Sequence, residues 1–248
     1  MELSIMELSI MELSIMERRI MERNLSTDLY ALGLSLLLLI SASCSRDGFV
    51  PRDGDLLFCL GDDSPMSEAI TTSTSSDSGV RYDHVALFAT IDGIPSVIES
   101  TSKSGVRVID WEEFLSEARP VGGKPGIDVM RIGEDIDIEA AIERALAFLG
   151  QGYDWYYLPS NGLMYCSELI YESFLRRDGT HLFTAIPMSF RDKDGNMPSF
   201  WVELFKGLGM DVPEGEPGTN PNDMSKDPVL RLVHRYFNLS DFRCSQGE

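Results

Sequence analysis

One cysteine and one histidine carry most of the chemistry that this sequence can offer. Cys166 stands in the segment YCSELIY (165–171), after a structure-breaking stretch at 159–162, and apolar residues follow it at helical spacing. This pattern predicts a helix that begins at the cysteine. Unpaired N–H groups and the positive end of the helix dipole favour a thiolate there, which is the form of cysteine that attacks carbonyls.

A thiolate that attacks a carbonyl needs a base, and the chain contains three histidines that could serve. They are His84, His181 and His234. The sequence suggests no arrangement that would bring a carboxylate to His181 or His234. His84 differs, because it opens a β-rich run that leads into a turn signal, and it is therefore the candidate base.

A β-hairpin is predicted around the turn signal Asp92-Gly93, which has β-rich runs on both sides. In a two-residue turn, the register places Glu99 on the same face as His84, diagonally across the strand pair. A carboxylate there could orient the imidazole and stabilise its protonated form. The alternative is a turn widened by Pro95, because a slip of one residue would move Glu99 to the opposite face.

Each member of this Cys–His–Glu set also has a structural interpretation. A single histidine in a strand is usually structural, a single apolar-flanked cysteine is usually core, and a glutamate at a strand end is usually solvated. The residues alone leave both interpretations open.

The composition excludes some classes of function. The chain has 248 residues and a formal net charge of −19, whereas nucleic-acid binding requires a basic face. Its four cysteines show no CxxC or Cys/His ligand spacing, so we expect neither a metal site nor a cofactor. Cys59 is expected to be a buried thiol in a strand, with a bridge to Cys244 as the alternative.

The first 43 residues are typical of a secretion signal in a chain whose start codon was assigned too far upstream. The pentapeptide MELSI occurs three times, and then come three arginines, an apolar run at 32–40 and small residues before Cys44. The apolar run is too short to span a bilayer comfortably. The junction is similar to a bacterial lipobox, so we expect Cys44 to be lipidated and 44–53 to be a linker. A plain secreted protein is the alternative.

Residues 54–248 are expected to form one domain, with a less certain extension from about 191. A polar loop is predicted at 71–79, a long surface loop at 213–223, and a strand or a helix at 229–237. The aromatic cluster Tyr153–Tyr157 suits either core packing or a substrate wall. Strands are predicted at 54–60, 84–90, 96–99, 105–109 and 127–132. Helices are predicted at 67–71, 111–118, 138–149, from 166, and at 200–209. The expected N-terminal caps of three of these helices are Ser67, Asp110 and Ser199.

Several motifs occur in one order along the chain. They are GDLLF (54–58), DHVALF (83–88), VIES with GVRV (97–108), GYDWYY (152–157) and YCSELIYESF (165–174). This order resembles that of the YiiX/YebB-like permuted papain-fold amidases of the NlpC superfamily. In that branch the histidine precedes the cysteine, as it does here. The resemblance covers roughly 54–190.

The resemblance implies an α+β, papain-like fold with circularly permuted topology. A central antiparallel sheet would pack against the helix that bears the cysteine. By their positions in the motifs, Cys166 matches the nucleophile, His84 the general base and Glu99 the polar residue that orients it. Tyr165 matches the aromatic residue before the cysteine, and we place it with Tyr153 on the substrate side. The helix-start geometry makes the Cys166 backbone N–H the expected oxyanion donor.

The expected activity is that of a cysteine hydrolase of the cell envelope. It would cleave an amide or ester through a thioester acyl-enzyme, in a cell-wall peptide or a lipid-linked substrate, at a membrane surface reached through the lipid on Cys44. An alternative is an acyltransferase or lipid amidase of the lecithin retinol acyltransferase type, which would have an apolar tunnel beside Cys166 instead of an open polar groove. A non-catalytic lipid- or peptide-binding lipoprotein is a further alternative.

Overall fold

The computed structural model describes residues 49, 51–74 and 79–246, with side chains as far as Phe242. By their contacts the residues divide into two units, 1–49 and 50–248, and the description below concerns the second. The predicted signal sequence and Cys44 lie outside the described residues. Within the described ranges, no helix is both long enough and apolar enough to cross a membrane.

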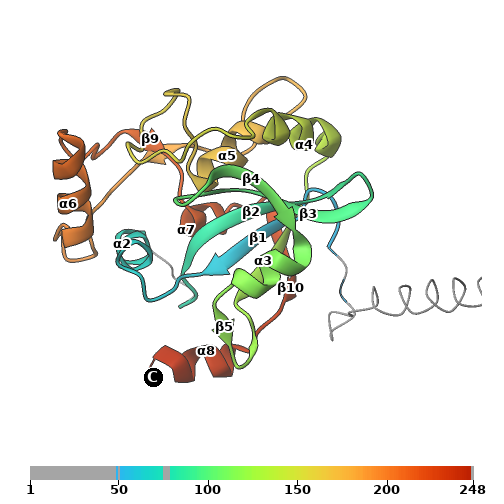
Figure 1. Cartoon of the computed structure of the whole chain (residues 1–248), viewed down its shortest axis with the longest axis horizontal. Coiled ribbons are helices and arrows are strands. Elements are labelled where there is room, and N and C mark those ends of the chain that lie inside the picture. Colours follow the sequence, from blue (N-terminus) through green and yellow to red (C-terminus); the bar gives the residue numbers. More distant parts are fainter. Residues whose placement is uncertain (1–48, 50, 75–78, 247–248) are drawn as a thin grey trace, which may run out of the picture. The chain divides into compact units, whose positions relative to one another are not determined.

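A six-stranded antiparallel sheet forms the centre of this unit (Figure 1), in the order β10-β7-β1-β2-β3-β4. The strands are β1 (Leu56–Leu60), β2 (Tyr82–Ile91), β3 (Ile94–Thr101), β4 (Gly105–Asp110), β7 (Ile127–Ile132) and β10 (Leu230–Arg235). The expected α+β class with a central antiparallel sheet is confirmed. The undecided segment 229–237 is the edge strand β10, paired with β7.

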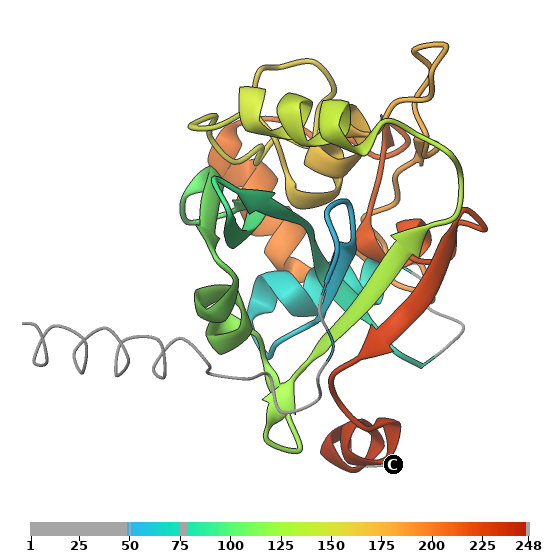
Figure 2. The ribbon, with the colours of Figure 1, turned by 90° about the vertical axis from the view of Figure 1, so that its right-hand side faces the viewer.

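The central strands read as continuous apolar runs because both of their faces are covered. Every residue of β1 is buried. One face meets α4 (Ile138–Ala147) and α5 (Cys166–Ser173), which lie side by side above the sheet (Figure 2). The predicted stripe of α4 packs on the core through Ala141 and Ala145, whereas Leu149 lies beyond the helix end and is exposed.

Three predicted helix starts differ in detail from the structure. Helix α2 (Pro65–Ser73) begins earlier than expected, and its cap is Ser64, whose Oγ accepts a hydrogen bond from the Ser67 N–H at 3.2 Å. Helix α3 (Trp111–Glu117) follows Asp110, but that side chain makes no capping bond. Helix α6 (Ser199–Leu208) starts at Ser199 after Pro198, so the serine is its first residue and not its cap.

The segment predicted as a long surface loop at 213–223 is partly buried, so that prediction is wrong. It contains β9 (Pro217–Gly218), which pairs with β8 (Ile186–Pro187), and the short helix α7 (Pro221–Met224). Asn222 is fully buried and bonds both the N–H and the carbonyl of Tyr82 at 2.8 Å. The proline and glycine residues do lie at turns, but the side-chain amide of Asn222 fixes this segment to β2 through long-range hydrogen bonds.

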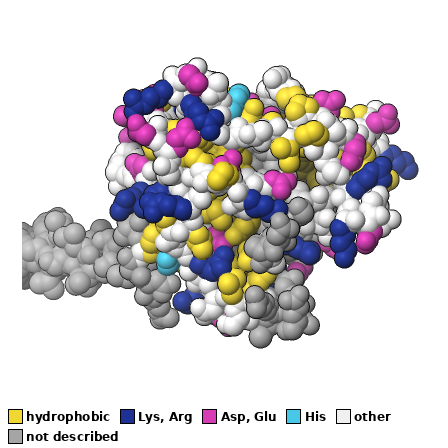
Figure 3. Space-filling model, turned by 180° about the vertical axis from the view of Figure 1, so that it is seen from behind, with side chains coloured by type: hydrophobic (Ala, Val, Ile, Leu, Met, Phe, Trp, Pro, Cys, Tyr) yellow, Lys and Arg dark blue, Asp and Glu magenta, His cyan; other side chains and the backbone are white. Residues whose placement is uncertain are grey.

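The remaining elements lie at the ends of the sheet. The ribbon of β5 (Pro120–Val121) and β6 (Lys124–Pro125) contacts α8 (Leu239–Gln246), where frayed residues were predicted. Seen from behind (Figure 3), acidic and basic side chains are interspersed over the surface, with scattered apolar patches between them.

Several groups of buried apolar side chains hold the unit together, and two of them bear on the position of Cys166. The larger group lies between the sheet and α4 and α5. The second group is largely aromatic and lies away from the sheet, where α6 packs on α2 (Figure 1); its buried members are Ala69, Tyr153, Tyr157, Tyr165, Phe190, Trp201 and Phe205. Burial of each large side chain contributes about 1.5–3 kcal/mol. This aromatic group connects the C-terminal region to the turn before α5.

Candidate active site

Cys166 is the first residue of α5, as predicted, and is 5% exposed. Leu169, Ile170 and Phe174 are fully buried on the core side, and they fix the helix against the sheet. The first N–H groups of a helix have no intrahelical acceptors, so they are available around the thiol. The thiol itself donates a hydrogen bond to the carbonyl oxygen of Asp83 at 3.9 Å.

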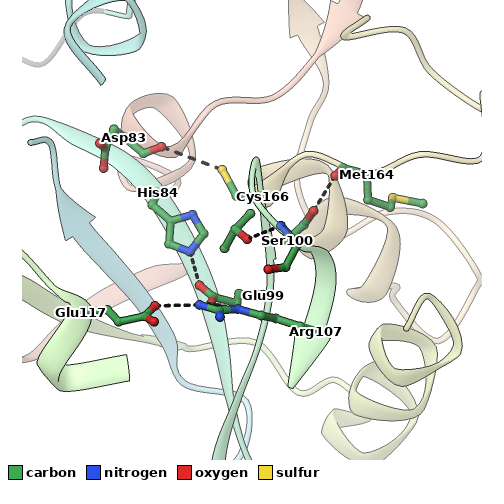
Figure 4. A network of polar contacts seen from close by, with 10 residues as sticks. Asp83, His84, Glu99, Ser100, Arg107, Glu117, Met164 and Cys166 are labelled. Atoms are coloured by element: carbon green, nitrogen blue, oxygen red, sulfur yellow. Dashed lines mark hydrogen bonds and ion pairs between the residues drawn. The ribbon is translucent and has the colours of Figure 1, made fainter. Parts of the chain in front are cut away.

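His84 lies on β2, and the predicted hairpin places it beside Glu99 on β3. Ile91 pairs with Ile94 across a two-residue turn whose residues, Asp92 and Gly93, have φ angles of 51° and 79°. Glycine and aspartate tolerate this left-handed region, so the turn keeps the tight register. In this register the His84 Nε2 atom lies 2.7 Å from the Glu99 Oε2 atom (Figure 4).

Cys166 and His84 meet across the boundary between α5 and β2. Glu99 occupies Nε2, so Nδ1 is the ring nitrogen that remains for the thiol, and Figure 4 shows the ring between the two side chains. Burial alone would lower the pKa of His84. Hydrogen bonds of the ring to Cys166 and to the Glu99 carboxylate, with the charges of these two groups, outweigh burial and hold that pKa well above its ordinary value. The site thus favours an imidazolium that faces sulfur.

Glu99 is 3% exposed and complements this charge. Burial would raise the pKa of its carboxyl, but His84 and Arg107 hold it below its ordinary value. A buried carboxylate that stays ionised can both orient the imidazole and stabilise its protonated form.

Arg107 and Glu117 also belong to this network, and sequence reasoning missed both. Arg107 lies directly opposite Glu99 in the β3–β4 pair, and its Nε donates to Glu99 Oε1 at 2.8 Å. Its Nη2 donates to Glu117 Oε2 on α3 at 2.7 Å. Extending the hairpin register to the next strand would have identified Arg107. No sequence pattern pointed to Glu117.

A second thiol, Cys59, is free and lies on β1 opposite His84. Burial raises its pKa well above the ordinary value, and the nearby Asp83 and Glu99 charges raise it further. Cys59 therefore stays protonated, whereas Cys166 has a helix start and a facing imidazole. This contrast identifies Cys166 as the candidate nucleophile of the pair.

A pocket opens on one side of Cys166, with about 850 Å³ of empty space that is partly open to solvent. Tyr153 and Tyr165, the residues predicted on the substrate side, both line it. The sequence did not indicate the opposite wall, which includes Phe190, Trp201 and Thr219 from the C-terminal region. These residues lie far from Cys166 in the sequence, so no local pattern could join them to it.

A second hollow lies on the other side of the cysteine–histidine pair, and His84 and Glu99 form part of its wall. Asp83 lines both hollows, and burial raises the pKa of its carboxyl. The pair therefore stands between an aromatic pocket and a more polar hollow.

The other two histidines lie apart from this site. His181 stacks on Tyr171 with ring centroids 3.9 Å apart, and its Nε2 lies 3.4 Å from Glu172 Oε2. A carboxylate partner that the sequence did not suggest therefore exists for His181. His234 lies on the edge strand β10.

This chain is similar in sequence to known proteins. A sequence model of one family matches residues 50–234 and is described as permuted papain-like amidase enzyme, YaeF/YiiX, C92 family. The uncharacterized protein YiiX of Escherichia coli strain K12 is 23% identical over 208 residues, which cover 82% of this chain and 96% of that protein.

A similar solved structure has the same architecture. The crystal structure of metalloprotein yiiX from Escherichia coli O157:H7 covers 77% of this chain and all of its own, with a TM-score of 0.61 and 20% sequence identity. At this identity the likeness shows the fold alone, and it agrees with the papain-like sheet and helix described above. The family match covers more than half of the chain. The chain belongs to the permuted papain-like amidase family of YaeF and YiiX, the C92 family, and its kind of activity is that of a cysteine hydrolase.

Proposed function

We propose that this protein is an amidase that works through a thioester acyl-enzyme. Cys166 is the nucleophile, His84 the general acid and base, and Glu99 the residue that orients His84. One observation carries the proposal: α5, β2 and β3 bring these three side chains together, with His84 Nε2 2.7 Å from Glu99 Oε2 and the pKa of His84 raised by Cys166 and Glu99.

In the acylation step, the Cys166 thiolate attacks the substrate carbonyl and a carbon–sulfur bond forms. Negative charge develops on the carbonyl oxygen, and the backbone N–H of Cys166 at the helix start can stabilise it. The imidazolium of His84 gives its proton to the leaving nitrogen or oxygen as the carbon–heteroatom bond breaks. The products are the thioester, a free amine or alcohol, and neutral His84.

In the deacylation step, water attacks the thioester and neutral His84 takes a proton from it. The carbon–sulfur bond breaks, the acid leaves, and the thiolate–imidazolium pair is restored. Glu99 stays ionised in both steps and compensates the charge of the imidazolium while it is present. If an amine or alcohol replaces water, the same chemistry transfers the acyl group.

The aromatic pocket suits the acyl part of the substrate. Tyr153, Tyr165 and Trp201 offer flat apolar surface next to Cys166, in a pocket that is partly open to solvent. Of the two substrate classes suggested by the sequence, this lining favours a lipid-linked or otherwise apolar acyl group over a strongly polar cell-wall peptide.

The same observation supports one second candidate, an acyltransferase or lipid amidase of the lecithin retinol acyltransferase type. Such an enzyme would hold the acyl chain on apolar walls and deliver it to an acceptor other than water. The measurement that separates the two is product analysis in the presence of an added amine. The non-catalytic alternative has little support, because a binding lipoprotein would not need the thiol, the imidazole and the carboxylate in contact.

Our mechanism contains no metal, although the solved relative is described as a metalloprotein. Across the described ranges, no group of three or more His, Cys, Asp or Glu side chains lies close enough together to hold a metal ion. The donor set present here therefore does not fit a protein-bound metal, and every step is assigned to the side chains above.

We also propose that the protein is a lipoprotein of the bacterial cell envelope. The support is the sequence before Cys44, where basic, apolar and small residues follow one another. A lipid on Cys44 would tether the domain through residues 44–53 and keep the site near lipid-linked substrates.

The test of the activity uses p-nitrophenyl esters and N-acyl p-nitroanilides with acyl groups of increasing length. Cys166→Ser should remove turnover while thermal unfolding stays unchanged. Cys59→Ser is the matched control, because it removes the other thiol of the site and should leave turnover within a few-fold. Turnover retained in Cys166→Ser would refute the proposed nucleophile.

A further inference from the structure

The carboxylate of Glu99 has two different partners, one on each oxygen. Oε2 faces His84 Nε2 at 2.7 Å, and Oε1 accepts from Arg107 Nε at 2.8 Å. Arg107 reaches further and donates to Glu117 Oε2 at 2.7 Å (Figure 4). A continuous chain of charges therefore runs from α3 through β4 and β3 to the imidazole on β2.

The burial of Glu99 makes its second oxygen important. The side chain is 3% exposed, so water cannot satisfy an oxygen that lacks a protein partner. Without Arg107, the carboxylate could rotate away from His84 or take up a proton. The guanidinium of Arg107 opposes both changes, because its Nε and Nη2 atoms hold Oε1, the oxygen that His84 does not contact, and because it supplies a positive charge beside the carboxylate.

We infer that Arg107 is a positioning residue of this enzyme: it holds the Glu99 carboxylate in line with His84. Glu117 partly neutralises the positive charge of Arg107. The inference rests on the proposed function. Arg107 lines neither of the two hollows beside Cys166 and His84. Its effect on catalysis therefore passes through Glu99 and His84.

A purely structural role predicts different behaviour. If Arg107 were only one member of a cross-strand ion pair, its loss would lower stability without moving a pH profile. Removing a positive charge from this site should instead raise the pKa of every titrating neighbour, and removing a negative charge should lower it. The charged or titratable groups around Glu99 are His84 on β2, Arg107 on β4, Cys59 on β1, Cys166 on α5, Glu117 on α3, and Asp83 with Asp62 and Arg119 at the adjoining hollow.

The experiment measures the pH dependence of Cys166 alkylation by iodoacetamide in a Cys59→Ser background, so that one thiol of the site reports. Arg107→Gln should move both apparent pKa values of the thiol–imidazole pair upward by about one pH unit, at the low end of the effect of a single nearby charge. Arg107→Lys keeps the charge and should restore most of the profile.

Glu117→Gln is the second variant, and it should shift the profile in the opposite direction, to lower pH, by a fraction of a unit. Because Glu117 is half exposed, this variant tests the inference even if Arg107→Gln does not fold. Arg119→Gln is the matched control, since it removes a positive charge from the same hollow without a bond to Glu99.

The outcomes separate the two proposals. A profile that depends on His84 but moves no further in Arg107→Gln than in Arg119→Gln would overturn the role of Arg107 and leave the proposed function intact. A wild-type profile that is unchanged by His84→Ala would overturn the proposed function itself.

Discussion

Glu168 is a buried carboxyl group in the same helix turn as Cys166, the proposed nucleophile, and its pKa shift can be tested. It lies in the first turn of α5, is 6% exposed, and accepts a hydrogen bond from the Tyr165 N–H at 3.3 Å. Asp154 is fully buried nearby and accepts bonds from the N–H groups of Tyr156 and Leu158. Burial, and then the charge of Asp154, raise the pKa of Glu168 to about 8. Glu168 is therefore neutral in the folded protein at pH 7.

The sign and size of the effect on stability follow from this shift. The folded-state pKa lies above the unfolded value, so between the two the folded state binds more protons and stability falls as pH rises. The window runs from about 4.5 to about 8, or roughly 3.5 units. At about 1.4 kcal/mol per unit, the upper limit is roughly 5 kcal/mol, and water that reaches the carboxyl would reduce it.

The assay is urea unfolding at intervals from pH 5 to pH 9, in wild type and in Glu168→Gln. The glutamine variant has no carboxyl group to titrate at this position. Its free energy of unfolding relative to wild type should therefore grow with pH across the window and level off above pH 8. Glu143→Gln on the neighbouring helix α4 is the control, because that side chain is exposed. A difference between Glu168→Gln and wild type that stays constant with pH would refute the reasoning.

Three further predictions concern the site and its location. Glu99→Gln should lower the pKa of His84 and move the basic limb of a pH–rate profile to lower pH by about one to two units. A basic limb that stays at the wild-type pH would contradict the role of Glu99. Gly218→Ala should lower kcat/KM for bulky acyl probes about tenfold, because the new Cβ would clash with the Met188 sulfur and lie 2.8 Å from the Tyr165 hydroxyl, both of which line the pocket, and short acyl probes serve as the control. Cys44→Ala should release the protein from the membrane fraction, and continued membrane association would count against lipidation.

Local patterns in the sequence were sufficient for the two halves of the candidate site. A turn at Asp92-Gly93 with left-handed φ angles fixes a hairpin register, and this register alone puts Glu99 on the face of His84. A structure-breaking stretch followed by apolar helical spacing was enough to place Cys166 at a helix start. Both inferences succeed because strand alternation and helix periodicity act over a few residues.

The meeting of these halves was not available from spacing, since Cys166 and His84 lie on separate elements. Motif order supplied that expectation through the resemblance to a family, and packing of α5 on β2 accomplishes it. The same limit explains why 213–223 was taken for a surface loop. Its composition is that of a loop, but the amide of Asn222 bonds the backbone of Tyr82, 140 residues away.

The sequence by itself determined the secondary structure of the core, the Cys–His–Glu candidates and the class of chemistry, because these depend on residue type and short-range geometry. Only the tertiary structure decided the surroundings of that chemistry. The aromatic pocket beside Cys166 takes one wall from the C-terminal region, and Arg107 and Glu117 join the candidate triad from β4 and α3. Contacts of this kind depend on how distant segments pack together, which no local pattern records.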